Sequence, residues 1–214
     1  MLMVVVMIGD SMTVSSIDKL KNRCKLAFGT RLVKWRQPYF EGRMVDTITF
    51  SRRAVITSGV THAAHGARSI DVVSWLKEEN LWAYCSDWEK KFLCNPKSKP
   101  SELNEASWQI ERLWIFAWAK GDIDTINHQK RCGVGLSLYF PRPGDRTQSF
   151  IQDTTLRNEN DIFKEHCLLS YLTEVINKHG SAPNNYEEGV VVERWHALNW
   201  LMSFDDKWPD SLWK

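Results

Sequence analysis

The sequence has almost no excess of charge of either sign and no pair of closely spaced cysteines. Lysine and arginine number 28 and aspartate and glutamate 26 in 214 residues, for a formal net charge of +2. The chain as a whole is therefore neither a general polyanion binder nor an acidic solvating protein. The five cysteines are odd in number and include no Cys-x-x-Cys pair, which argues against a disulfide framework and a structural zinc site. We expect a reducing cytoplasm as the compartment.

The sequence also lacks the short motifs of several enzyme classes. Gly133 and Gly135 are two positions apart, but the third glycine of a phosphate-binding loop and a following helix signal are missing. There is no Gly-x-Ser-x-Gly turn of the kind that holds a hydrolase nucleophile. These absences argue against nucleotide-binding loops and common serine hydrolases, and we predict no cofactor.

No run of apolar residues is long enough to span a bilayer. The first segment, Met1 to Ile8, is apolar, but it lacks a basic leader before it and a small-residue cleavage site after it. We interpret it as a short buried strand over residues 3–8 or an apolar lead-in, and we expect no contact with a membrane.

The sequence is rich in apolar residues at helical spacing and contains eleven tryptophans. This spacing predicts helices over residues 16–28, 52–64, 70–79, 102–120, 162–176 and 188–203, and a capping box at Ser86 and Glu89 predicts one more. The segment 102–120 is apolar on nearly every face, as in a buried helix. A chain of this length can fold around its own core. The predicted fold class is mainly α, a single globular helical domain with minor strands at residues 3–8 and 136–140.

Basic residues are concentrated near the start of the chain. Between Lys19 and Arg43 there are eight lysines and arginines against one acid, so that the rest of the chain is acidic. We predict a basic segment, residues 1–45, packed on a helical domain of residues 46–214. Aromatic residues lie among these cations, a mixture that follows a phosphate backbone while stacking on bases. The candidate nucleic-acid contacts are Lys34, Trp35, Arg36 and Tyr39. A solvated helix and loop has the same composition, so both interpretations stay open.

One arginine falls inside the apolar stripe of a predicted helix. In the segment 188–203, Arg194 shares a face with Val191 and Leu198, and a buried guanidinium must be paired. Glu111 lies in the buried segment 102–120, and we therefore predict a Glu111–Arg194 ion pair, with Glu193 and His196 on the flank nearer solvent. The pair either fixes how two helices pack or belongs to a cleft in which Arg194 or Glu193 binds an anion or a partner.

Two patterns of histidine have the spacing of metal ligands. His62 and His65 lie one helical turn apart, and Glu193 precedes His196 at the spacing used in some helical-bundle metal sites. Such sites need a second matching set, and the sequence has neither a second Glu-x-x-His nor a His-Glu-x-x-His. We interpret these histidines as solvated or hydrogen-bonded and predict no metal site.

The tryptophans fall into two groups. Most lie on predicted helices or their caps and are expected in the core, each with an indole N–H that needs an acceptor. Trp208 and Trp213 follow the last predicted helix. Aromatic residues left at a surface are candidate interface anchors, so these two are predicted binding residues.

Four stretches of the sequence occur together and in order in one known family. They are Arg53-Ala54-Val55; Trp75-Leu76-Lys77-Glu78-Glu79-Asn80-Leu81-Trp82; Ser107-Trp108-Gln109-Ile110-Glu111 with Leu113-Trp114; and Glu193-Arg194-Trp195-His196-Ala197-Leu198-Asn199-Trp200-Leu201. In these residues the chain resembles an uncharacterised bacterial family, domain of unknown function 4272, over about residues 52–208. The first 45 residues and the C-terminal end differ from the family's pattern. The resemblance implies a helical fold and no known chemistry.

The absence of a catalytic constellation in an aromatic-rich helical domain favours a non-enzymatic function. Our leading prediction is an intracellular protein-binding module, of an immunity type that neutralises a cognate toxin. One alternative is a hydrolase-like enzyme with Glu193 and His196 as catalytic residues and Arg194 in the same cleft. The other alternative is nucleic-acid binding through residues 19–43, which would show a steep dependence on salt. The sequence leaves the oligomeric state open.

Overall fold

The computed structural model describes residues 18–22, 24–25, 36–38, 44–95, 97–133, 135–183, 185–203 and 208. Its main helices are α2 (Thr47–Ala64), α3 (Ser69–Glu78), α4 (Asp87–Cys94), α5 (Pro100–Trp108), α6 (Ile110–Lys120), α7 (Gln148–Asp153), α8 (Glu159–His179) and α9 (Glu188–Leu201), with two single 3₁₀ turns, η1 (Trp82–Tyr84) and η2 (Leu136–Leu138). No strand occurs among these described residues, and the predicted mainly α class is confirmed.

The strand predicted at residues 136–140 is wrong. Gly135 adopts a left-handed conformation, with φ of 84°, and the chain then closes into the turn η2. The N–H groups of Leu138 and Tyr139 bond to carbonyls three residues back, so they are not available for a neighbouring strand. Leu136 is buried by this turn while Leu138 is exposed. The strand predicted at residues 3–8 lies outside the described residues.

Local sequence explains where the helices begin and end. The Asp46 carboxylate accepts hydrogen bonds from the backbone N–H of Thr49, at 2.9 Å, and from its hydroxyl, at 2.7 Å, which caps α2. The predicted capping box of Ser86 and Glu89 is present at the start of α4. Gly121, with φ of 95°, ends α6 in the left-handed region that glycine adopts without steric cost.

The segment 102–120 is not one helix as predicted. It divides at Gln109, whose N–H bonds to the Ala106 carbonyl three residues back, so the α-helical ladder is interrupted there. In α5 Ala106 is the buried residue, whereas α6 is buried along most of its length. The polar residues of α5 therefore face solvent, and the helix that is apolar all round is the shorter α6.

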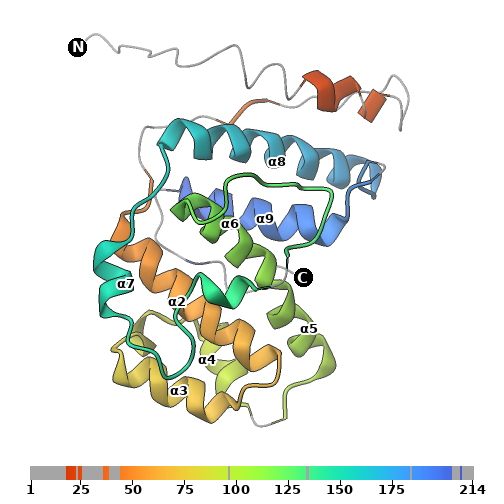
Figure 1. Cartoon of the computed structure of the whole chain (residues 1–214). Helices are drawn as coiled ribbons and strands as arrows, with labels where there is room; N and C mark the ends of the chain where they lie inside the picture. Colours follow the sequence, from red (N-terminus) through yellow and green to blue (C-terminus); the bar gives the residue numbers. More distant parts are fainter. Residues whose placement is uncertain are drawn as a thin grey trace, which may run out of the picture.

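The core has two parts that share α2. The first unites α6, α8 and α9 with the beginning of α2, and includes Phe50, Phe116 and Leu172. The second joins the rest of α2 to α3 and α4, around Val60 and Leu76. Figure 1 shows α8 lying over α6 and α9, with α2, α3 and α4 on the other side of the molecule. Helix α2 connects the two parts, which explains why it is buried on nearly every face.

Part of the helix predicted over residues 16–28 falls within the described residues. Residues 18–22 and 24–25 are helical, and Leu20 and Cys24 are buried in the first core. The division of the chain at residue 45 stays a prediction. Within the ranges described, no helix is both long and apolar enough to cross a membrane.

Candidate functional site

The predicted ion pair between Glu111 and Arg194 is present at the centre of the first core. Arg194 has none of its surface exposed, and its Nε and Nη2 lie 2.9 and 2.8 Å from Glu111 Oε2. The same guanidinium donates to the carbonyls of Asn127 and Lys130, each at 2.9 Å. Burial lowers the pKa of Arg194, and Glu111 opposes this effect. The loop after α6 is thus attached to α9 through one arginine.

A second ion pair lies beside the first, and in this pair α6 supplies the arginine and α9 the glutamate. Arg112 of α6 donates from Nε to Glu193 Oε2 of α9 at 2.6 Å, and both side chains are buried. The prediction that Glu193 lies nearer solvent is wrong, because none of its surface is exposed. Consecutive Glu-Arg residues of α6 therefore pair with consecutive Glu-Arg residues of α9. We call Glu111, Arg112, Glu193 and Arg194 the Glu–Arg cluster.

A third buried pair extends this arrangement toward the second core. Arg53 of α2 lies 2.7 Å from Glu89 of α4 and also donates to the Tyr84 carbonyl at 2.7 Å. The ring of Trp208 lies between the two arginines, 4.8 Å from the Arg53 guanidinium and 5.0 Å from that of Arg112. Trp208 is only 9% exposed, so the prediction that it is a surface anchor is wrong. Its indole fills the space between the guanidiniums of Arg53 and Arg112. The glutamate partners of these two arginines were not recognised from the sequence.

His196, the second catalytic candidate, is half-buried beside this cluster. Burial, and then the charge of Arg112, lower the pKa of His196 to about 3, so the imidazole is neutral near pH 7. Its ring contacts that of Trp195, with 4.8 Å between centroids. Glu193 and His196 line none of the three pockets considered below. None of these three pockets therefore provides a cleft for the predicted hydrolase at these residues.

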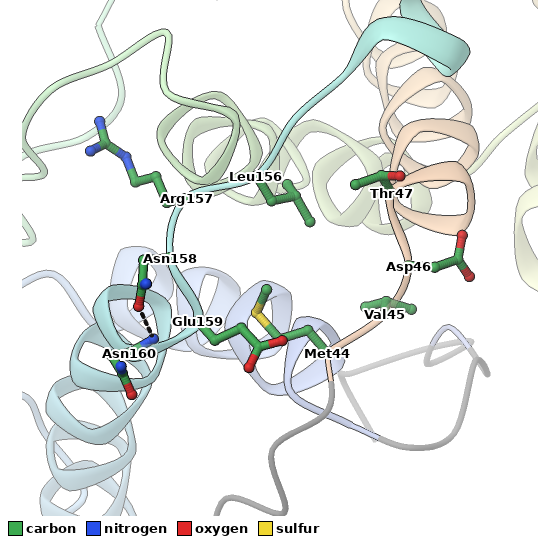
Figure 2. Close-up of a pocket in the computed structure, with 9 residues that line it drawn as sticks. All are labelled: Met44, Val45, Asp46, Thr47, Leu156, Arg157, Asn158, Glu159 and Asn160. Carbon is green, nitrogen blue, oxygen red and sulfur yellow. Dashed lines mark hydrogen bonds between the residues drawn. The ribbon is translucent and has the colours of Figure 1, made fainter. Parts of the chain in front are cut away.

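The first pocket lies between the beginnings of α2 and α8 and has a volume of about 490 Å³. Figure 2 shows Leu156 and Thr47 on its two sides, with the Arg157 guanidinium directed away. Arg157 donates to the carbonyls of Trp118 and Ile123, and the side chain of Asn158 caps α8. Because Arg157 is already engaged with the end of α6 and the loop after it, and Asn158 with the start of α8, the pocket is explained by the packing of the fold.

The second pocket is an open groove between α5 and the beginning of α9, with a volume of about 600 Å³. Its lining, which we call the acidic groove, comprises Ser101, Asn104, Glu105, Trp108, Glu187, Glu188 and Gly189. The four residues from α5 recur every three or four positions and so share one face of the helix. Among the described residues, no hydrogen bond or ion pair is formed by the carboxylates of Glu105 and Glu188. The groove therefore offers, beside a half-buried indole, two acidic groups that no described residue pairs with.

A guanidinium already lies over the tryptophan of the acidic groove. Arg131 is 4.8 Å from the Trp108 ring centroid, and its Nε lies 2.8 Å from Glu187 Oε2, while Nη2 donates to Oε1. The hydrogen bond with Arg131 lowers the pKa of Glu187, and Glu187 in turn raises the pKa of Arg131. The arginine side chain is 64% exposed, so this cation is held at the surface.

The position of Trp108 depends on a glycine. A Cβ atom at Gly189 would come within 2.9 Å of the Trp108 ring, closer than side chains pack. Trp108 was expected in the core, but the close approach to Gly189 places its ring in the wall of the groove. The three-to-four spacing along α5 could have suggested this face, whereas the contribution from α9 depends on tertiary structure.

Most of the remaining predicted site residues lie outside the part of the chain that the structure describes. Lys34, Trp35, Tyr39 and Trp213 lie outside the described residues, and Arg36 is exposed. The nucleic-acid interface therefore stays a prediction. Within the part of the chain that the structure describes, no group of three histidine, cysteine or acidic residues is arranged to hold a metal ion.

Comparison with known proteins identifies one family. The model of a family described as "Domain of unknown function (DUF4272)" matches residues 40–211, a range that includes the Glu–Arg cluster and the acidic groove. No curated protein and no solved structure matches the chain. The resemblance predicted from four stretches of sequence is confirmed.

Proposed function

The chain belongs to the DUF4272 family, and we propose that it is a protein-binding module whose acidic groove receives a basic side chain of a partner protein. The observation that carries this proposal is the Arg131 guanidinium, which stacks on Trp108 and pairs with Glu187. The groove is thus suited to a cation, and Glu105 and Glu188 remain for another one. An arginine or lysine of the partner would lie beside Trp108 with both carboxylates within reach.

The groove contains one residue of a type that anchors protein interfaces, Trp108, beside three glutamates. Tryptophan is enriched among the residues that dominate binding energy, and partly exposed glutamates steer a basic partner to the site. The immunity-type role is the more specific form of the proposal: the partner would be a toxin with a basic surface. We also propose a cytoplasmic location, which agrees with five cysteines that are all free thiols.

Two alternatives have less support. A hydrolase built on Glu193 and His196 would need those groups in a cleft, and Glu193 is fully buried in an ion pair. Nucleic-acid binding through Lys34, Trp35, Arg36 and Tyr39 rests on sequence composition alone. The acidic groove on the same chain would repel a polyanion, so it does not favour nucleic acid as the partner.

The test is capture of a partner from the native host by the full chain and by matched variants. Trp108→Ala, and the double variant Glu105→Gln/Glu188→Gln, should each reduce the amount of partner recovered, about tenfold or more for Trp108→Ala. Glu174→Gln removes one exposed glutamate on α8, outside the groove, and should leave recovery unchanged. The partner should be basic, and the interaction should weaken with added salt.

Several results would contradict the proposal. The groove would not be the binding site if a partner bound equally to wild type, Trp108→Ala and the double glutamine variant. Recovery of nucleic acid instead of protein, removed by Arg36→Gln, would favour the basic segment. An acidic partner would also contradict the proposal, because it would be repelled by Glu105 and Glu188.

A further inference from the structure

A third pocket lies between the C-terminal half of α2, the beginning of α6 and the segment around η2. It has a volume of about 350 Å³ and is lined on one side by Thr61, His62 and His65, and on the other by Leu113, Leu136 and Phe140. A cavity of this size with one polar and one apolar wall is typical of sites for small molecules. We call it the His62 pocket.

The hydrogen bonds within α2 fix which nitrogen of each histidine is free. Nδ1 of His62 lies 2.8 Å from the Ser58 carbonyl, and Nδ1 of His65 lies 2.8 Å from the Thr61 carbonyl. A carbonyl oxygen only accepts hydrogen bonds, so each Nδ1 carries the hydrogen. In the neutral ring Nε2 is then an acceptor, and no described residue donates to it. Both imidazoles therefore present acceptors rather than donors.

The hydroxyl groups of the same wall already donate their hydrogens to backbone carbonyls. Ser58 donates to the Pro141 carbonyl at 2.9 Å, and Thr61 donates to the Thr57 carbonyl at 2.8 Å. Each hydroxyl oxygen keeps a lone pair for a further hydrogen bond. The polar wall of the His62 pocket thus consists of acceptors, and a complementary ligand must supply hydrogen-bond donors.

Among the described residues that line the His62 pocket there is no aspartate, glutamate, lysine or arginine to balance a charged ligand. Cys132 is its remaining reactive group, and burial, with a further contribution from Glu111, raises the pKa of this thiol to about 12. The thiol therefore stays protonated and is a poor nucleophile and metal ligand near pH 7. Glu111 itself accepts the backbone N–H of Cys132 at 2.9 Å and is held in the Glu–Arg cluster. The chemistry of the pocket is that of binding an uncharged molecule.

We propose that the His62 pocket binds a small uncharged aromatic or aliphatic alcohol, whose hydroxyl group donates to Nε2 of His62 or His65 and whose apolar part packs against Leu113, Leu136 and Phe140. This ligand site is separate from the acidic groove, and neither proposal depends on the other. The pocket lies next to the loop that carries Arg131, the cation of the groove, since Cys132 and Gly133 are in its wall.

The experiment compares two probes that differ by one hydrogen-bond donor. The full chain, labelled with ¹⁵N in its histidines, is titrated with 4-propylphenol and with 4-propylanisole, and the Nε2 signals of His62 and His65 are followed by NMR. The phenol should saturate the shift of an Nε2 signal. The methyl ether has a similar apolar body without the donor and should bind roughly tenfold more weakly, the effect of leaving a buried acceptor without its partner.

Variants separate the pocket from the rest of the chain. Because the hydroxyl group donates to one of the two histidines, either His62→Leu or His65→Leu should weaken binding of the phenol about tenfold, while His179→Leu, at the end of α8 and outside the pocket, should leave it unchanged. Since His65 is exposed, His65→Leu provides a second test in a position where the fold does not depend on the side chain.

Four outcomes would overturn the proposal. They are equal affinity for the phenol and its ether, unchanged affinity in both histidine variants, the absence of a saturable shift up to the solubility of the phenol, and a stoichiometric shift of both Nε2 signals by Zn²⁺ with none by the phenol. The last outcome would assign the two histidines to a metal ion instead.

Discussion

The surroundings of Trp208, which include Arg112 and Glu193 of the Glu–Arg cluster, and the acidic groove with the adjoining Arg131 contain the same three residue types and differ in their access to water. In the core, Trp208 lies between Arg53 and Arg112, whose guanidiniums pair with Glu89 and Glu193. At the surface, a single arginine lies over the tryptophan of the groove and pairs with one glutamate. Both regions therefore combine an indole, a guanidinium and a carboxylate.

The difference lies in the balance of charge. In the Glu–Arg cluster each carboxylate has its own cation, because an uncompensated buried charge costs several kcal/mol. In the groove three glutamates share one arginine, an imbalance that water tolerates. Complete pairing is thus a mark of a structural role here, and a surplus of one sign marks the surface that is open to a partner.

Loss of one buried arginine should have the largest effect. Arg194→Met leaves Glu111 buried without its cation and should lower the free energy of unfolding by about 4 kcal/mol. Arg131→Met removes the corresponding surface pair and should cost at most about 1 kcal/mol. Chemical denaturation of both variants measures the contrast, and equal losses would erase the distinction between the two regions. Glu111→Gln with unchanged stability would likewise contradict the Glu111–Arg194 pair as a determinant of the fold.

Trp208 in the core and Trp108 in the groove should show the same contrast in their effect on stability. Trp208→Ala removes an indole that is packed against Phe116, Trp200 and two guanidiniums, and should cost about 3 kcal/mol. Trp108→Ala, in the wall of the groove, should cost about 1 kcal/mol. Thermal unfolding followed by calorimetry would compare them. A larger loss for Trp108 would indicate that the groove is part of the core.

The stability of the region around the Glu–Arg cluster should depend on pH through His196. Because its pKa is lowered from 6.5 to about 3 in the fold, the unfolded chain binds a proton in this range and the folded chain does not. The contribution of the neutral imidazole is therefore complete above pH 6.5 and is lost progressively as the pH falls toward about 3. The free energy of unfolding of wild type should fall more steeply over this range than that of His196→Gln. Parallel profiles would contradict the shift.

Substitution of Gly189, the glycine of the groove, should have a smaller effect on stability. The sign of this effect should depend on whether residue 108 is tryptophan. Gly189→Ala places a Cβ atom against the Trp108 ring and should cost about 1 kcal/mol. In the Trp108→Ala background the clash is absent, and the same change should stabilise α9 by up to about 1 kcal/mol because alanine favours a helix. A double-mutant cycle by denaturation tests this, and a cost in both backgrounds would refute the contact.

The smallest effect on stability is expected for the free glutamates. Glu105→Gln and Glu188→Gln should each change the free energy of unfolding by less than about 0.5 kcal/mol, since both carboxylates are without a cation in the described structure. Their effect should be confined to partner binding. A large destabilisation would show that these groups have structural partners and that the groove is not a free surface.

The sequence was sufficient for features that depend on one residue in one helix. Arg194 could be recognised as buried because it interrupts an apolar stripe, and Ser86 with Glu89 identifies the start of α4 within a few residues. The helical class follows in the same way from spacing. The break at Gln109 was missed because helical periodicity continues across it, although the hydrogen-bond ladder does not.

Features that depend on contact between two elements were not predicted. Arg112 lies among apolar residues much as Arg194 does, so the rule used for Arg194 could have identified it, but its partner Glu193 was assigned to solvent because only one face of α9 was taken as buried. In the structure α9 packs against α8 as well as α6, and both faces are covered. Trp208 was assigned to the surface because nothing in the sequence shows that Arg53 and Arg112 lie on either side of it.

The exchange of partners within the Glu–Arg cluster has a consequence for helix register. Glu111 pairs with Arg194 and Arg112 with Glu193, so the two contacts run crosswise between α6 and α9. A shift of α9 by one residue in one direction would set Glu111 against Glu193 and leave Arg112 without a carboxylate. A shift in the other direction would set Arg112 against Arg194 and leave Glu111 without a cation, so either shift turns one attraction into a repulsion and removes the other in a medium of low polarity. Apolar contacts between the same helices tolerate such a shift far better. The four charges thus select one alignment of α6 and α9 among several that hydrophobic packing alone would allow.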